Sequence, residues 1–368
     1  MASHTLRPEN VIGKLSLIDR FLPLWIFIAM GLGTALGRGW PGFGVTLGQA
    51  KVAGVSWPIA IGLWWMMFPV LAKVRYESLG RFAAKGKVLG LSLVFNWLLG
   101  PFVMFTLAWL MLPDLPHYRS GLIMIGLARC IAMVLLWNDL AQGDREAAAV
   151  MVAINAIFQI LMYSVLGYFF LAVLPVWLGG AATALNVSMW PIARSVLIFL
   201  GIPLAAGAIT RVVGVRLKGV AWYDQVLMAK IGPSALWGLL YTIVLMFAMQ
   251  GDRFVSLPMD VLRIALPLVA YFGIMFFLAF AVSKAVGLDY RECAALSFTA
   301  AGNNFELAIA VAVGMFGIAS SEALAAVVGP LIEVPALVAL VYVALWLKRR
   351  WFPNDLDQTL DLPDCARG

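Results

Sequence analysis

Polar and ionisable side chains interrupt otherwise apolar stretches of this sequence at four places. They are, in chain order, Asn96-Trp97 with Pro101, Arg129-Cys130, Gly302-Asn303-Asn304-Phe305-Glu306, and Glu333 between Pro330 and Pro335. Such side chains are costly inside a bilayer, where they usually face a cavity, a partner or a conduction pathway. Glycine, two amides and a carboxylate within five residues also suit an interrupted helix whose free backbone groups bind a polar solute. We therefore predict a solute or proton pathway here, with helix-to-helix hydrogen bonding as the alternative.

Cys130 adds a soft sulfur to this set, and its neighbour Arg129 carries a charge that favours the thiolate. Sulfur suits a thiophilic solute rather than a sugar or an organic acid. Taken alone, a cysteine in an apolar helix is more often a small buried hydrophobe than a ligand. Arg129 either tunes the site or pairs with a carboxylate such as Glu306 or Asp139. Glu333 either carries protons or satisfies backbone groups that its flanking prolines leave free.

The elements that carry these residues are predicted to be membrane helices. Of the 368 residues, 63% are hydrophobic and 12% are charged, whereas soluble domains have about 25% charged residues. The apolar runs are long enough for helices to cross a bilayer and lack the alternation of a membrane barrel. The sequence thus predicts an all-α polytopic membrane protein with ten transmembrane helices. Their predicted ranges are 21–39, 56–72, 88–112, 120–141, 147–175, 190–210, 228–250, 261–287, 294–317 and 323–347.

Lysine and arginine predict the orientation, because basic loops are retained in the cytoplasm. With both termini cytoplasmic, nineteen of the 26 basic residues fall on the inner side and six on the outer side, and Arg129 lies within a span. We therefore predict cytoplasmic tails at 1–20 and 349–368 and a location in the plasma or inner membrane. We interpret the net charge of +7 as the result of this excess of basic residues on the cytoplasmic side, where it would attract anionic lipid. It is not interpreted as a sign of nucleic-acid binding.

An internal repeat is predicted to divide the membrane region into five helices over 21–175 and five over 176–348. An offset of 174 residues aligns Cys130 with Asn304, Gln159 with Glu333 and Tyr168 with Tyr342. Five spans per repeat is an odd number, so the second repeat must insert upside down relative to the first. Inverted repeats are typical of secondary transporters, whose site lies near the midplane between broken helices.

Other classes of membrane protein fit the sequence less well. The stretch GRFAAKGKV at 80–88 fails as a P-loop because of its glycine spacing and because no Ser or Thr follows the lysine. No segment is large enough for an ATPase domain, so we expect an ion or solute gradient to drive the protein. Cys130, Cys293 and Cys365 are too widely separated for a disulfide framework or a paired metal motif, and no cofactor is predicted.

Four segments carry a specific resemblance to a known family. They are PIAIGLWWMMFPVLAKVRYE, GLIMIGLARCIAMVLLWNDLAQGD, FTAAGNNFELAIAVAVGMFGI and VVGPLIEVPALVALVYVALW. From about residue 20 to 352, the chain resembles the arsenite-efflux permeases of the bile acid, arsenite and riboflavin transporter superfamily. The resemblance implies a ten-helix inverted-repeat fold in which helices four and nine are broken and cross.

The same resemblance implies export of trivalent arsenic, as undissociated arsenious acid, in exchange for protons. Antimonite is a further expected cargo. The family's essential cysteine on helix four and glutamate on helix nine fall on Cys130 and Glu306. Cys130 is thus expected to capture the metalloid, Asn303 and Asn304 to hold its hydroxyls, and Glu306, with Glu333, to carry the proton. Four polar residues are expected to support the site, namely Arg129, Asn96, Asn138 and Gln159.

Two rival functions remain to be distinguished. The nearer one is a sodium-coupled symporter of bile acids or other organic anions on the same fold, which would need clustered oxygen ligands for sodium. Asn303, Asn304, Glu306 and Asn138 could supply some of these oxygens. An intramembrane enzyme with Cys130 as nucleophile lacks a paired base, because no histidine falls in any predicted span.

Overall fold

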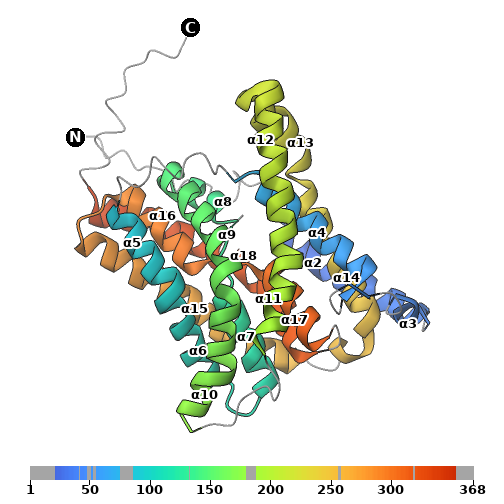
Figure 1. Ribbon diagram of the computed structural model, residues 1–368. Helices are drawn as coiled ribbons and strands as arrows, with labels where there is room; N and C mark the ends of the chain where they lie inside the picture. The colour runs from blue at the N-terminus through green and yellow to red at the C-terminus, as the bar shows by residue number, and fades with distance from the viewer. Residues whose placement is uncertain are drawn as a thin grey trace, which may run out of the picture.

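The structure of this chain is a computed structural model, and almost all of what it describes is helical (Figure 1). The described residues are 21–40, 42–47, 51–52, 55–74, 86–131, 133–179, 188–255, 258–317 and 320–353. Within these described ranges, the strands that depart from the predicted all-α class are β1 (Lys51–Val52) and β2 (Val55–Ser56), which pair antiparallel. The predicted tail 1–20 and most of the tail 349–368 lie outside the described residues.

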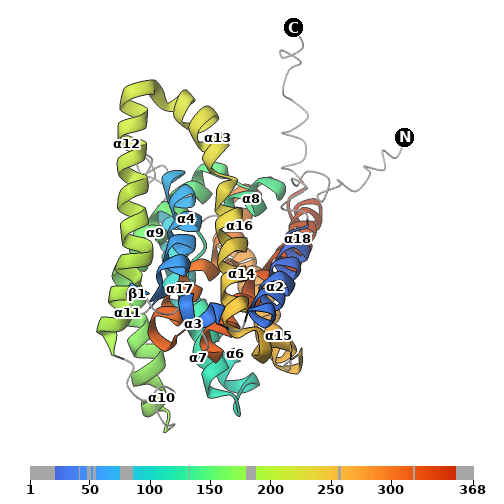
Figure 2. The same cartoon turned by 90° about the vertical axis from the view of Figure 1, so that its right-hand side faces the viewer.

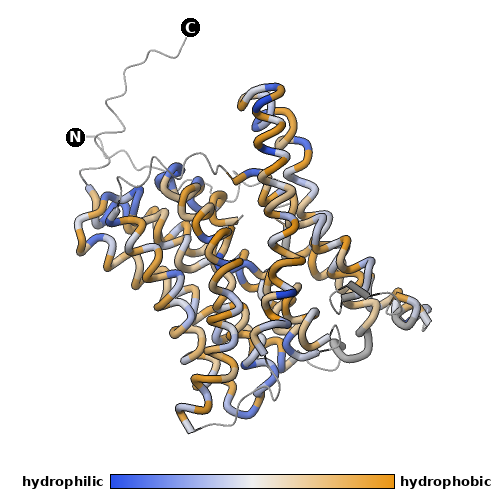
Figure 3. Tube along the Cα trace, in the orientation of Figure 1, coloured by the Kyte–Doolittle hydropathy of each residue, from blue (hydrophilic) through white to orange (hydrophobic). Residues whose placement is uncertain are grey.

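The composition of the helices is that of a multi-pass membrane protein. Five helical stretches are long and apolar enough to cross a bilayer, namely Gly86–Met111, Arg145–Trp177, Met189–Met249, Met259–Ala285 and Ser321–Trp351. Shorter apolar helices lie at Leu24–Gly39, Trp57–Ala72 and Phe305–Phe316. Hydrophilic residues gather toward the helix ends (Figure 3). Large apolar side chains such as Phe27, Leu110 and Trp177 are exposed on the outside, an arrangement that suits lipid rather than water.

Four helices form one packed group, which we call the scaffold. They are α2 (Leu22–Gly39), α4 (Trp57–Ala72), α12 (Ile202–Trp222) and α14 (Ser234–Val255). Helices α2 and α4 both pack on α14, and α12 packs on α4 (Figure 2). Glycine permits the close approach, because a Cβ at Gly33 or Gly37 would clash with the backbone of α14. Small residues at helix contacts are the usual means of tight packing in membranes.

The remaining long helices form a second group, which contains all four polar interruptions. It comprises α5 (Gly86–Val94), α6 (Gly100–Met111), α7 (Pro116–Leu127), α8 (Met133–Leu140), α9 (Arg145–Tyr168), α15 (Pro258–Ala285), α16 (Tyr290–Ala301), α17 (Phe305–Phe316) and α18 (Ser321–Trp351). Four short helices remain, namely α3 (Phe43–Leu47), α10 (Leu174–Trp177), α11 (Met189–Val196) and α13 (Met228–Ile231). Of these, α10 ends the long stretch that begins with α9, and α11 begins the stretch that continues into α12.

Proline shapes several of these helices. The π-helical turns η3 (Phe95–Leu99), η4 (Phe169–Val173) and η5 (Leu197–Gly201) each end two residues before a proline, while η6 (Tyr223–Leu227) has none in that position. Proline lacks an N–H and clashes with the preceding turn, so a widened π turn accommodates it without ending the helix. All ten predicted stretches fall on helices, and three of them are interrupted within the described residues: after residue 127 between α7 and α8, at 232–233 between α13 and α14, and at 302–304 between α16 and α17. The first and third of these interruptions carry polar side chains of the predicted site.

Candidate functional site

The two interruptions that carry these polar side chains lie against each other and form a single backbone crossover. Arg129 and Asn303 face each other in an isolated antiparallel bridge. The N–H of Cys130 donates to the Gly302 carbonyl at 3.3 Å, and the N–H of Asn304 donates to the Ala128 carbonyl at 2.9 Å. Backbone groups that leave a helix inside a membrane must find partners within the protein. Each break therefore provides hydrogen-bond partners for backbone groups that the other break leaves free.

The two amides of the second break bind helix ends. Asn303 Nδ2 donates to the carbonyl oxygens of Ile125 and Ala128 at 2.9 and 3.2 Å, at the end of α7. Asn304 Oδ1 accepts from the N–H of Leu307 at 3.0 Å and so caps the first turn of α17. Asn303 thus keeps only its Oδ1, which has no partner among the described residues, to accept a bond from a solute.

Gln159 and Glu333 hold the crossover from its two sides. The Oε1 of Gln159, on α9, accepts from the Arg129 N–H at 3.2 Å. The Oε1 of Glu333, on α18, accepts from the Asn303 N–H at 3.4 Å. Both side chains are buried. Glu333 therefore satisfies a backbone group of the crossover, rather than a group that its own flanking prolines leave free.

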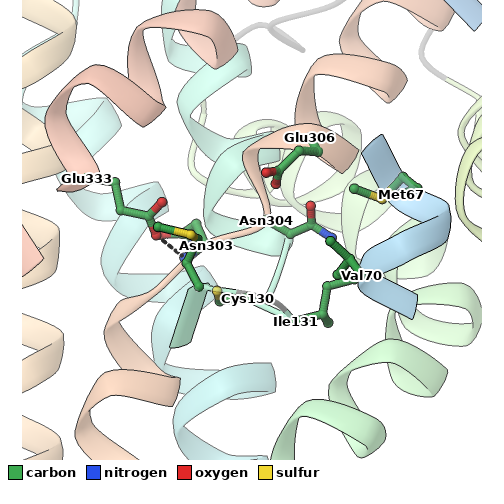
Figure 4. Close-up of a pocket in the computed structure, with 9 residues that line it drawn as sticks. Met67, Val70, Cys130, Ile131, Asn303, Asn304, Glu306 and Glu333 are labelled. Atoms are coloured by element: carbon green, nitrogen blue, oxygen red, sulfur yellow. Dashed lines mark hydrogen bonds between the residues drawn. The ribbon is translucent and has the colours of Figure 1, made fainter. Parts of the chain in front are cut away.

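A small pocket opens beside the crossover (Figure 4). Five of the predicted site residues line it, namely Cys130, Asn303, Asn304, Glu306 and Glu333. Met67 and Val70 of the scaffold helix α4 form the facing wall, and Ile131 and Met133 complete it. The free volume is about 10 Å³, which is room for about one water molecule. A larger solute can bind only when the walls move apart.

The pocket lies between the scaffold and the second group, and its chemistry is mixed. One thiol, two amides and two carboxylates share the pocket with apolar side chains, two of which are the methionines Met67 and Met133. Cys130 is 2% exposed, whereas Glu306 is half-buried. Among the described residues, no other side chain is a hydrogen-bond partner of the Glu306 carboxylate. The site therefore offers one thiol, which is the soft group that can form a thiolate, together with several oxygens and one accessible carboxylate.

Arg129 points its guanidinium away from the carboxylates that the sequence suggested as partners. It is fully buried, and its Nη1 donates to the Tyr271 hydroxyl on α15 at 2.7 Å. Asp139 instead pairs with Arg145. Within the described ranges, Arg129 Nε and Nη2 have no partner. Tyr271 was not predicted from the sequence; its only signal there is a hydroxyl within an apolar helix.

Removing the Tyr271 hydroxyl should lower thermal stability more than removing a hydroxyl bonded to a neutral group. A hydrogen bond to a charged group contributes about 1.5–3 kcal/mol, against about 0.5–1.5 kcal/mol for a neutral pair. We expect Tyr271→Phe to lower the Tm in detergent by more than Tyr163→Phe does. Tyr163 is a matched control, because its buried hydroxyl donates to the Met124 carbonyl at 2.9 Å. Equal losses would show that the guanidinium does not depend on Tyr271.

Like Arg129 and Gln159, the other two predicted supporting residues lie outside the pocket. Asn96, on η3, donates to the carbonyl oxygen and hydroxyl of Ser92 at 2.9 and 3.1 Å. Asn138, on α8, is buried, and its side-chain amide has no partner in the part of the chain that the structure describes. Neither residue lines the pocket. Met67 and Val70 do line it, and no feature of an apolar run distinguishes them from residues that face lipid.

Comparison with known proteins places the chain in a family. Residues 60–257 match the Sodium Bile acid symporter family. The chain is 54% identical to the arsenical-resistance protein Acr3 of Corynebacterium glutamicum, over 96% of this chain and 95% of that protein. It is 35% identical to an uncharacterized transporter of Synechocystis sp., over 96% and 95% of the two chains. It is 34% identical to the Acr3 protein of Alkaliphilus metalliredigens, over 94% and 98%. The chain therefore belongs to the Sodium Bile acid symporter family and, within it, to the family of the Acr3 arsenical-resistance proteins.

Proposed function

We propose that this protein exports trivalent arsenic from the cytoplasm, as undissociated arsenious acid, in exchange for protons. The observation that carries the proposal is a single thiol, Cys130, in a pocket at the crossover, in a chain 54% identical to an arsenical-resistance protein. Thiolate sulfur is the ligand that soft metals and metalloids prefer. Antimonite, which has the same trivalent chemistry, is a second proposed cargo.

One sulfur suits a transporter better than several. A cage of three thiolates would hold the metalloid too tightly for release, whereas one sulfur assisted by neutral oxygens permits turnover. In the proposed mode, Cys130 takes the solute while the Asn303 Oδ1 accepts a bond from one of its hydroxyls. The Asn304 amide, which lines the same pocket, contributes its remaining hydrogen-bonding capacity.

Glu306 is the better of the two carboxylates for moving a proton. It is half-buried at the pocket, while Glu333 is bonded to the crossover backbone. Exchange of a neutral solute for one proton moves one charge across the membrane. A potential of 100 mV then supplies about 2.3 kcal/mol, equivalent to a solute gradient of about forty-fold.

We further propose that the ten predicted spans form two inverted repeats, 21–175 and 176–348. Helices α7 and α16 support this, because both their first and their last residues differ by 174 positions, the offset that the sequence suggested. The backbone bonds to Gln159 and Glu333 follow the same offset. In this proposal both termini are cytoplasmic and the protein resides in the plasma or inner membrane.

Arsenic content of intact cells tests the proposal. Arsenite-sensitive bacteria that express the chain should hold several-fold less arsenic than cells with an empty vector when both are exposed to arsenite. The physical reason is continuous export driven by the membrane potential. Equal arsenic contents, with the protein detected in the membrane, would contradict the proposal.

The name of the matched family favours one alternative, a sodium-coupled symporter of organic anions. The pocket oxygens of Glu306, Glu333 and Asn303 are of the kind that bind sodium. Replacing sodium with potassium and adding taurocholate distinguishes the two. Arsenite transport that is unchanged by both supports the arsenic exporter. Loss of transport without sodium, or competition by taurocholate, would favour the symporter.

Gly302 provides a test of the packing around the thiol. A Cβ added at Gly302 would lie 3.0 Å from the Cβ and 3.5 Å from the Sγ of Cys130. Overpacking of this kind costs about 1–3 kcal/mol, so Gly302→Val should reduce arsenite uptake by about ten-fold or more. Gly90→Val is the matched control, because nothing lies within 4 Å of a Cβ there. Equal uptake by both variants would show that the thiol position tolerates displacement.

A further inference from the structure

We propose that Gln159 and Glu333 are a matched pair of positioning residues, each holding one strand of the crossover through a backbone N–H. By fixing the crossover they set how Cys130 and Asn304 face the pocket. The inference deepens the proposed function and rests on it only where transport is the readout. It assigns Glu333 a role that a neutral amide performs equally well.

The geometry of the bridge creates the need for such a pair. The bonds from Cys130 and Asn304 flank Arg129 and Asn303, which makes the latter two a non-hydrogen-bonded pair of an antiparallel ladder. The N–H groups of such a pair point away from the opposite strand. They must therefore find acceptors on neighbouring elements, since no water is present in the hydrocarbon region to satisfy them.

Gln159 and Glu333 supply those acceptors from opposite sides. The N···O distances are 3.2 Å from Arg129 to Gln159 and 3.4 Å from Asn303 to Glu333. In both cases the acceptor lies 30 residues after the donor. Gln159 is fully buried and Glu333 is 5% exposed. The loss of either side chain would leave a buried donor without a partner.

Gln159 also orients a pocket residue directly. Its Oε1 accepts from Asn304 Nδ2 at 3.5 Å, while its own Nε2 donates to the Asn155 carbonyl at 3.2 Å and fixes the side chain. The Asn304 amide is thereby held between Gln159 and the N–H of Leu307. A change at Gln159 should therefore alter solute affinity as well as the backbone.

Glu333 differs from Gln159 in charge but makes the equivalent backbone contact. A carboxylate oxygen and an amide oxygen are both acceptors. If the role is positioning, Glu333→Gln keeps the crossover intact, whereas Glu333→Leu does not. If the negative charge of Glu333 is required instead, Glu333→Gln and Glu333→Leu should disturb the crossover to the same extent.

Hydrogen exchange of the crossover amides tests the pair without any solute. In the full-length protein in lipid nanodiscs, Gln159→Leu should accelerate exchange in a peptide covering 126–131 by about ten-fold, and Glu333→Leu should do so in a peptide covering 302–306. Glu333→Gln should remain within about three-fold of the parent. Gln159→Glu should exchange more slowly than Gln159→Leu, because its carboxylate can still accept from the Arg129 N–H although it loses the bond to the Asn155 carbonyl. Ser164→Ala is the control on α9, because it removes a buried hydroxyl that lacks a partner among the described residues.

Arsenite uptake then separates positioning from a general structural defect. Gln159→Leu should raise the half-saturating arsenite concentration by about ten-fold with a smaller effect on the maximal rate, and Gln159→Glu should restore it. A lower maximal rate with unchanged half-saturation would overturn the inference. If the leucine variants do not fold, the amide exchange of Glu333→Gln decides: protection equal to that of the parent in the peptide covering 302–306 supports the pair, and faster exchange there overturns it.

The exchange result also remains informative if the proposed function fails. A parent protein that transports no arsenite contradicts the arsenic assignment alone. Faster exchange at the matched peptide, with rescue by the conservative variants, would still establish the positioning pair. Unchanged exchange in both leucine variants would overturn the pair whatever the protein transports.

Discussion

Arsenite export should fall by about 100-fold in Cys130→Ser, a loss of about 2.7 kcal/mol of solute binding. Serine has nearly the same size, so the packing around this 2% exposed side chain should be kept. Its hydroxyl is a hard donor, however, and cannot replace sulfur as a ligand for a soft metalloid. The measurement is the initial rate of arsenite uptake by inside-out membrane vesicles at matched protein content.

Cys293 provides the matched control for this substitution. It is also a buried cysteine, but its Sγ lies by the Leu288 carbonyl at 3.6 Å and it does not line the pocket. Cys293→Ser should therefore retain most of the parental rate. Full export by Cys130→Ser would rule out capture by the thiol, and an equal loss in both variants would indicate a folding defect.

Glu306→Gln should abolish the response of transport to a proton gradient. The carboxylate lies at the pocket in the first turn of α17, and glutamine preserves its shape while removing the group that binds a proton. In inside-out vesicles the parent should take up arsenite faster when the lumen is acidified. The variant should show the same low rate at both lumenal pH values, and it should lose the accumulation of about forty-fold per 100 mV.

Glu322→Gln tests whether any buried glutamate has this effect. Glu322 is 4% exposed on α18, is bonded to His117 at 2.8 Å and does not line the pocket. Its substitution should leave the pH response intact. A Glu306→Gln variant with the parental pH response would exclude Glu306 as the proton carrier.

The sequence was sufficient to locate the helices and the polar residues of the pocket. Apolar runs of about 20 residues bounded by basic clusters can hardly fold otherwise in a bilayer, and all ten predicted stretches fall on helices. Polar side chains at equivalent positions of the two predicted repeats indicated one shared site. Cys130, Asn304 and Glu306 indeed line one pocket.

The partners of these residues were beyond the reach of the sequence. Asn303 was expected to hold a solute, but both of its amide donors bind the end of α7. One expectation for Arg129 was a pairing with a carboxylate, but its guanidinium donates to Tyr271, 142 positions along the chain. Such choices depend on the crossover geometry, which brings together segments distant in sequence and leaves no local pattern.

The residues of the facing pocket wall could not be predicted from the sequence either. Met67 and Val70 belong to α4, whose residues are apolar on every side. A helix with no amphipathic pattern does not reveal which face meets lipid and which meets another helix. Only the packing of the scaffold against the second group identifies these two residues as pocket walls.

The most direct test of the account is arsenite uptake by inside-out vesicles with an acidic lumen, with and without a protonophore, for the parent and Cys130→Ser. The account predicts rapid uptake by the parent that collapses with the protonophore and that Cys130→Ser lacks under both conditions. Uptake that persists after the proton gradient has been dissipated, or that Cys130→Ser retains, would contradict proton-driven efflux through a thiol site.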